Sequence, residues 1–190
     1  MMPHIDIHYS PYLDEIFKIW IKSMHAFKEW VIPPVKTVEE KALLFQKTWE
    51  KDGLLILKEI SEITGLSFKR NYIPVYVVSG NPRAYSNPIV IKSRLTESEF
   101  INELTHELVH CLFVDNKDSQ FVRNADVLFD NDHIALFAVI ESVLLGTIDE
   151  KIDVENFPGN SKYSDAMSYV KKVGHYHIIE ECKRHHDNVQ

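Results

Sequence analysis

The sequence predicts an α+β fold in which a small twisted sheet packs against one central apolar helix, with additional helices on its N- and C-terminal sides. Residues 72–80 and 89–93 are rich in Val, Ile and Tyr, which is the composition of strands. Residues 97–113 follow them with apolar side chains at helical spacing. Helical patterns before and after this central part complete the prediction.

We expect a single domain over residues 1–190, because the chain is long enough to bury a core and too short for two large domains. Within it we expect an N-terminal helical part at 1–70 and a central part at 71–146 with the strands and two helices. A C-terminal helical part should follow at 147–190.

Composition and charge argue against several classes of protein. The formal charge of -7 and the pI near 5.8 disfavour a nucleic-acid partner, because such proteins gather positive charge on one face. The cysteines, Cys111 and Cys182, are too few for a disulfide scaffold. No secretory signal pattern opens the sequence, and no run approaches about 18 apolar residues. We therefore expect a cytoplasmic protein with no membrane partner.

The N-terminal part should contain two helices. The first is expected within residues 12–31 and ends before a Pro-Pro pair, which cannot continue a helix. Thr37 and Glu40 form a capping-box pattern for the second, whose apolar spacing continues up to Gly65. Gly53 is a point at which this helix could divide.

The central part begins with two strands joined by "GNPRAYSNP", which indicates a long hairpin or loop. Within it, "RAYSNP" could form a flap over a site, although a plain turn is the simpler interpretation. Thr96 and Glu99 repeat the capping-box pattern and should begin the helix at 97–113.

A polar stretch then leads to a nearly all-apolar helix, "HIALFAVIESVLLG". Asn131 or Asp132 would cap its start, and Gly146 would end it. After a surface connection, residues 164–186 should form a last amphipathic helix interrupted at Gly174. Its histidines, among them His185 and His186, are most simply solvated.

The central helix carries the pattern HExxH. His106 and His110 lie four positions apart, so both imidazoles face the same side of the helix and can reach one ion. Zinc (Zn²⁺) suits such a pair, because a catalytic zinc needs three protein ligands and keeps one position for water. Glu107 would then stand beside the metal, where its carboxylate can take a proton from that water.

Two residues of the next helix are candidates for the third ligand. His133 and Glu141 lie on one stripe of it. We favour His133, because the helix N-terminus favours a neutral imidazole that can coordinate a metal. Glu141 remains the alternative, or an outer catalytic carboxylate, because an ionised group within an apolar helix needs a partner.

Residues 72–146, with two strands, "LTHELVH" and a downstream helix, resemble the zincin metallopeptidases. The resemblance implies that His106 and His110 bind zinc and that Glu107 is the general base. It also implies that the strand around "PIVIK" is the edge along which an extended peptide substrate lies. The metzincin pattern is absent, so the chain looks more gluzincin-like, with an atypical third ligand.

We therefore expect a zinc-dependent hydrolase, and specifically a metallopeptidase acting on a peptide or protein substrate. A zincin also needs a donor for the developing oxyanion, for which the sequence offers four candidates: Tyr163, Tyr169, Tyr176 and His175. Two alternatives stay open. One is a catalytically inactive zincin-like module that binds peptides or regulates a partner, and the other is a protein without metal in which the motif is accidental. The pattern of residues gives no oligomeric state.

Overall fold

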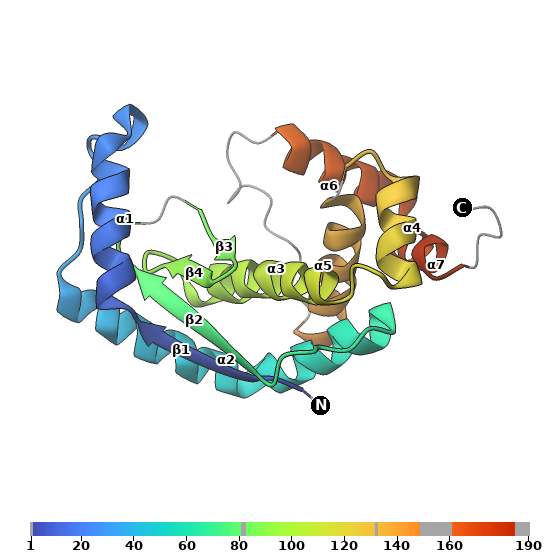
Figure 1. Cartoon of the computed structure of the whole chain (residues 1–190), viewed down its shortest axis with the longest axis horizontal. Helices are drawn as coiled ribbons and strands as arrows, with labels where there is room; N and C mark the ends of the chain where they lie inside the picture. The colour runs from blue at the N-terminus through green and yellow to red at the C-terminus, as the bar shows by residue number, and fades with distance from the viewer. Residues whose placement is uncertain (1, 81–82, 132, 149–160, 185–190) are drawn as a thin grey trace. The chain divides into compact units, whose positions relative to one another are not determined.

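A computed structural model describes residues 2–80, 83–131, 133–148 and 161–184. Figure 1 shows the order of the helices and strands. They are β1 (His4–Tyr9), α1 (Pro11–Ser23), the short 3-10 helix η1 (His25–Phe27), α2 (Val35–Thr64), β2 (Tyr72–Val78), β3 (Tyr85–Ser86), β4 (Ile89–Lys92), α3 (Glu97–Asp115), α4 (Gln120–Leu128), α5 (His133–Thr147), α6 (Ser161–Val173) and α7 (His175–Lys183). The α+β class is confirmed.

The chain forms two compact units. One contains the strands and consists of Pro3–Gly53 and Arg70–Glu107, and we call it the sheet unit. The other, the helical unit, consists of Met1–Met2, Leu54–Lys69 and Leu108–Gln190. The division falls inside α2 and α3, each of which is continuous through it. The expected single domain stays a prediction.

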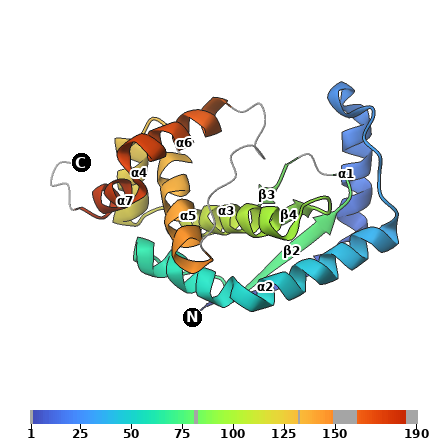
Figure 2. The same cartoon turned by 180° about the vertical axis from the view of Figure 1, so that it is seen from behind.

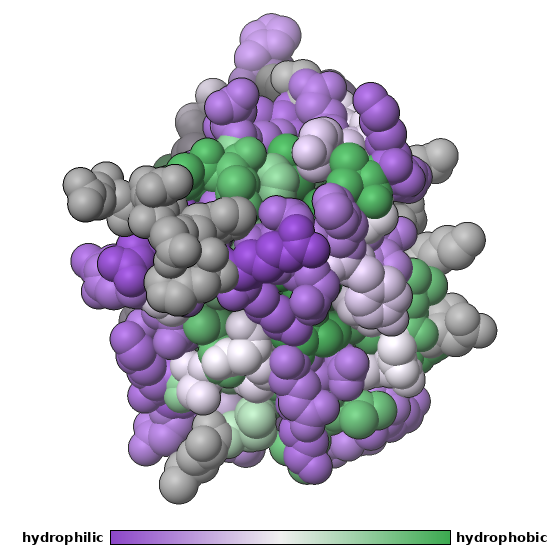
Figure 3. All heavy atoms as spheres, turned by 90° about the vertical axis from the view of Figure 1, so that its right-hand side faces the viewer, coloured by the Kyte–Doolittle hydropathy of each residue, from purple (hydrophilic) through white to green (hydrophobic). Residues whose placement is uncertain are grey.

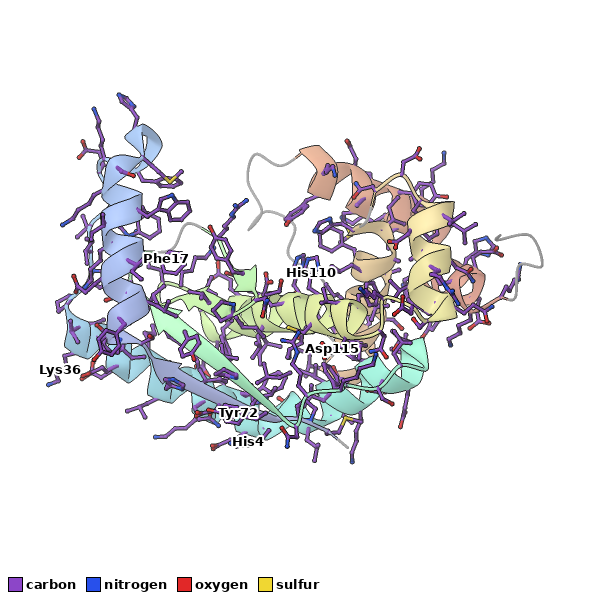
Figure 4. All side chains as sticks on the ribbon, viewed as in Figure 1. His4, Phe17, Lys36, Tyr72, His110 and Asp115 are labelled. Carbon is purple, nitrogen blue, oxygen red and sulfur yellow. The ribbon has the colours of Figure 1, made fainter. Side chains whose placement is uncertain are left out.

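The sheet has the order β1-β2-β4-β3, with β1, β2 and β4 parallel and β3 antiparallel to β4. Its first strand was not predicted. In β1 the alternating Ile5 and Ile7 are buried, as half-buried strands require. His4 pairs with Tyr72 in the parallel register, and Figure 4 shows both at the beginning of their strands.

The two predicted strands are β2 and β4, and they are parallel neighbours. They therefore cannot form a hairpin with each other. The connection contains β3, which pairs with β4 through Tyr85 opposite Val90 and is followed by a cis peptide bond at Asn87-Pro88. The segment "RAYSNP" is thus partly strand. The implied substrate edge is also corrected, because β4 lies inside the sheet between β2 and β3.

Helix α2 begins at Val35, directly after the Pro-Pro pair, and does not divide at Gly53. The glycine is needed for packing, since a Cβ at this position would lie 2.2 Å from the ring of Trp49, one turn earlier. On the side of α2 facing α3, Phe45 stacks on Phe100 with ring centroids 4.3 Å apart. This stack fixes the first turn of α3 against α2 within the sheet unit.

The predicted capping box begins α3. The backbone N–H of Thr96 donates to Glu99 Oε2 at 2.6 Å, and the N–H of Glu99 donates to Thr96 Oγ1 at 3.3 Å. The helix continues to Asp115, with apolar side chains such as Leu104 and Leu108 completely buried. The local signal therefore identified the helix that carries HExxH.

Helix α1 is held to the sheet by a buried carboxylate. Asp14 Oδ1 accepts hydrogen bonds from the backbone N–H and the hydroxyl of Ser79, both at 2.6 Å, at the end of β2. Its Oδ2 accepts from Tyr9 at 3.1 Å and pairs with Lys18 Nζ at 2.9 Å. Burial alone would raise the pKa of Asp14, but these partners outweigh it and lower the pKa below its usual value.

In the helical unit α5 packs against α6 and α7, and α4 against α7 (Figures 1 and 2). Helix α4 was not predicted. Gly146 does not end α5, which continues to Thr147, whereas Gly174, with a φ of 93°, separates α6 from α7 as expected. The expected cap Asp132 and the histidines His185 and His186 lie outside the described residues.

The surface drawn in Figure 3 is mixed, with hydrophobic side chains in separate patches between hydrophilic ones. Among the described residues, no helix combines the length and the apolar character needed to cross a membrane.

Candidate metal centre

Three histidines form a cluster in the described part of the chain. His106 and His110 come from successive turns of α3, and His133 is the first residue of α5. One ligand atom from each lies within 4.8 Å of the others. His106 and His133 are buried and His110 is half-buried. Figure 4 shows the side chain of His110 standing out from α3, and its ring lies 5.2 Å from that of His133.

His133 reaches the cluster because of how α5 begins. Its backbone N–H donates to Asn131 Oδ1 at 3.1 Å, so Asn131 caps the helix as predicted. The amide nitrogen of the same side chain donates to the carbonyl of Lys162 at 2.6 Å, next to the start of α6. One side chain thereby fixes the start of α5 relative to α6 and sets the position of His133.

The donor set fits a transition-metal ion. Neutral imidazole nitrogens suit zinc, copper, iron and nickel, whereas magnesium and calcium prefer oxygen ligands. Three histidines are one of the ligand sets that hold a catalytic zinc, whose fourth position is taken by water. The three side chains lie close enough to bind one metal ion.

Glu107 follows the first histidine and is only 6% exposed. The pKa of its carboxyl group is raised to about 8, mainly by burial and then by the charge of Glu103, while the charge of Arg83 acts in the opposite direction. The side chain is therefore protonated at neutral pH when no cation is nearby. A metal ion bound by the adjacent His106 would favour the ionised form, which is the form that can accept a proton.

Glu103 lies one turn before Glu107 on α3 and is also buried. Burial raises the pKa of Glu103, and the neighbouring Lys92 of β4, 3.4 Å away, lowers it. Glu103 was not among the site residues predicted from the sequence. Its signal was present, because a carboxylate four positions before Glu107 on a helix lies on the same face.

Glu141, the alternative third ligand, does not belong to the histidine cluster. Its carboxylate lies 3.8 Å from Nδ1 of His175 on α7, and both side chains are largely buried. A partner on the neighbouring helix thus accounts for this carboxylate in an apolar helix, which sequence reasoning had assigned to the metal or its surroundings.

The four candidates for an oxyanion donor differ in the rings that they contact. Tyr163 lies against His133 with ring centroids 4.4 Å apart. Tyr169 packs on Phe129 instead, while Tyr176 packs on His175. Of the four, Tyr163 is the one whose ring contact is with a histidine of the cluster.

In comparisons with known proteins, the chain matches no family model, no curated protein and no solved structure.

Proposed function

We propose that the protein is a zinc-dependent hydrolase, specifically a metallopeptidase of the zincin type. The observation that carries the proposal is the convergence of His106, His110 and His133, to which the sequence adds Glu107 directly after the first histidine. This is the residue content of an HExxH site with a third histidine.

The histidines would hold the ion, and each contributes one neutral nitrogen. When bound, zinc supplies a Lewis acid that polarises a carbonyl oxygen and makes water more acidic. Glu107 takes the proton from the attacking water on a carboxylate oxygen and returns it to the leaving amine. Its burial keeps competing solvent away from this proton transfer.

Tyr163 is the proposed donor to the oxyanion. Its ring lies against His133 and also 5.7 Å from the ring of Phe137, so contacts from α5 restrict its movement. A phenolic O–H held beside a metal ligand can stabilise negative charge as it develops on the carbonyl oxygen.

The proposal includes a cytoplasmic location. Both cysteines of the chain, Cys111 and Cys182, are buried thiols, which is usual for proteins of reducing compartments.

The test combines metal analysis with one substitution. Purified protein should contain about one zinc per chain, and His133→Ala should lose most of it. Glu107→Gln should keep the zinc, while kcat for peptide hydrolysis falls by about 10²–10⁴-fold. Glu62→Gln, on the exposed surface of α2, is the matched control and should leave both unchanged.

Two results would contradict the proposal. Full activity of the Glu107→Gln protein would show that Glu107 is not the general base. Purified protein without about one metal ion per chain would show that the histidines do not form a metal site. Zinc without hydrolysis of any peptide would indicate the alternative, an inactive module that binds peptides.

A further inference from the structure

Helix α1 carries apolar side chains on the side that faces away from the sheet. Its buried residues, Asp14 and Ile21, lie on one side of the helix. On the opposite side, Tyr12, Ile16 and Ile19 are 86%, 61% and 71% exposed. Figure 1 shows α1 at the margin of the sheet unit, to which the whole helix belongs. The helix therefore presents an apolar stripe to solvent.

The stripe has the spacing of a seam between two helices. Successive members are separated by four, three and four positions, as in Tyr12, Ile16, Ile19 and Ser23. This alternation is that of the two contact positions, a and d, in a heptad repeat. On one flank of the stripe, the half-buried ring of Trp20 widens the apolar surface. Such a face is what one amphipathic helix offers to another.

The other flank of the stripe carries charges of both signs. Glu15 and Lys22 lie seven positions apart and therefore on the same flank, about two turns from each other. Both are exposed, and Glu15 also pairs with Lys18 within the helix at 2.9 Å. When two copies of such a helix pack antiparallel, like flanks meet and the order of charges is reversed. Glu15 of each copy then approaches Lys22 of the other, whereas a parallel pair would bring this flank against that of Trp20.

Charge also argues against a lipid surface as the occupant. The sequence of α1 contains two acidic residues and two lysines, so the helix has no net charge, and the whole chain has a net charge of -7. Helices that lie on anionic membranes instead carry an excess of Lys and Arg on the polar face. A second copy of the chain matches both the apolar stripe and the charged flank.

We propose that the outer face of α1 is a self-association surface, on which two copies of the chain pair antiparallel about a two-fold axis near Phe17 and Lys18. Ile16 of one copy packs against Ile19 of the other, and because the contact is isologous it closes at the dimer. This surface is separate from the histidine cluster, and the inference does not depend on hydrolysis.

The dimer should be weak. One pair of 13-residue helices buries less than the roughly 800 Å² per partner of a standard interface, so we expect a dissociation constant on the order of 10 μM. Sedimentation velocity of the full-length protein, over concentrations from about 1 to 200 μM, should show a reversible monomer–dimer equilibrium.

One substitution tests the stripe. Ile16→Lys places an ammonium group of each copy in the apolar seam and should weaken the dimer at least about tenfold. The matched control is Leu43→Lys, because Leu43 is 64% exposed on α2 in the same unit. This control should leave the dissociation constant within about twofold of the wild-type value.

A charge exchange tests the antiparallel arrangement. Glu15→Lys or Lys22→Glu alone brings like charges together across the pair, and each should weaken the dimer about fivefold. The double variant, with both substitutions, should restore the dissociation constant to within about twofold of wild type. Loss of the Glu15–Lys18 pair within the helix is common to the single and the double variant, so it cannot produce this recovery.

Several results would overturn the inference. They are a wild-type protein that stays monomeric at the highest concentration, a dimer that tolerates Ile16→Lys, a double variant that does not recover, and association beyond the dimer. Co-sedimentation with phosphatidylserine vesicles gives a further arm. Vesicle binding by a monomeric wild-type protein that Ile16→Lys abolishes would assign the stripe to a lipid surface instead. The charge exchange keeps the test decisive even where Ile16→Lys lowers the stability of the fold.

Discussion

Asp14 and Glu107 are two carboxylates of the sheet unit with almost no exposure, 0% and 6%, and their surroundings act in opposite directions. Asp14 receives hydrogen bonds from Ser79 and Tyr9 and pairs with Lys18, and its pKa is lowered. Glu107 lies beside a second buried carboxylate, and its pKa is raised to about 8.

The difference separates a carboxylate with a structural role from one that suits the proposed role in proton transfer. A buried negative charge that is fully paired holds two elements together and has no reason to change protonation. A buried carboxyl group with a raised pKa is costly to ionise, and such costs are found most often where a proton must be exchanged or a cation bound. The position of Glu107 next to the histidine cluster agrees with the second case.

The largest effect should come from removing the paired charge. Asp14→Asn should lower the free energy of unfolding by about 3 kcal/mol, because it leaves Lys18 and the Ser79 donors poorly paired in a buried site. Urea denaturation at pH 7 measures the change. Glu15→Gln is the control, since the Glu15 side chain is 69% exposed and pairs with the same lysine, and it should change stability by less than about 0.5 kcal/mol.

The difference in stability between the wild-type and Asp14→Asn proteins should decrease as the pH falls. Because the pKa of Asp14 is lower in the folded protein, its contribution is present above the unfolded value of 3.8 and is lost as the pH falls through the folded value. The gap between wild-type and Asp14→Asn proteins should therefore close only in acid below about pH 4. A gap that closes between pH 5 and 8 would show that another group is responsible.

Glu107→Gln should change the free energy of unfolding in the direction opposite to Asp14→Asn. In zinc-free protein at pH 8 the substitution should raise the free energy of unfolding by about 1–3 kcal/mol, because it removes the cost of a buried carboxyl group that ionises readily only when unfolded. With the folded pKa near 8 and an ordinary value of 4.5, the stability of the wild type falls as pH rises through this window. The gain should vanish at pH 4, and a loss of stability at pH 8 would contradict the contrast with Asp14.

Lys92→Met should give the smallest change in the free energy of unfolding. It tests whether Glu103 behaves like the paired carboxylate of Asp14 or like Glu107. Lys92 Nζ lies 3.4 Å from Glu103 Oε2, which is longer than a typical charge-assisted hydrogen bond, and burial has the largest influence on the pKa of Glu103. We expect a loss of about 1 kcal/mol at pH 8 and a smaller loss at pH 4, where the carboxyl group is protonated in both states. Lys36→Met, an exposed lysine at the start of α2, is the control in the same denaturation series.

Local patterns predicted the helices near the proposed site, because their determinants are close in sequence. The capping box of Thr96 and Glu99 and the apolar spacing of α3 are complete within twenty residues, and Asn131 caps α5 in the same way. The proximity of His106 and His110 could also be predicted, because residues four positions apart on one helix are neighbours whatever the tertiary structure.

Features that depend on tertiary packing were not predictable in the same way. Strand β1 is stabilised by parallel pairing with β2, more than sixty residues later, although the alternation of Ile5 and Ile7 with the polar His4, Asp6 and His8 was a local signal that was passed over. The short helix α4 lies in a segment read as polar loop, although Phe121 and Val122 are buried. Gly53 continues a helix because a tryptophan ring occupies the space beside it.

The residues around the histidine cluster were predicted partly from local sequence patterns and partly depend on tertiary packing. The choice of His133 over Glu141 rested on a general argument about helix ends, whereas the pairing of Glu141 with His175 requires the packing of α5 on α7. Selecting Tyr163 among four candidates required the contact of α6 with α5.

The cap at Asn131 has a consequence for how a metal would be acquired. An unfolded chain can offer His106 and His110 as a weak pair wherever one helical turn forms, whereas the position of His133 depends on a side chain that contacts both the start of α5 and the backbone of Lys162. Tight chelation would then be a late event in maturation, and loading would proceed on an already assembled protein rather than during its synthesis.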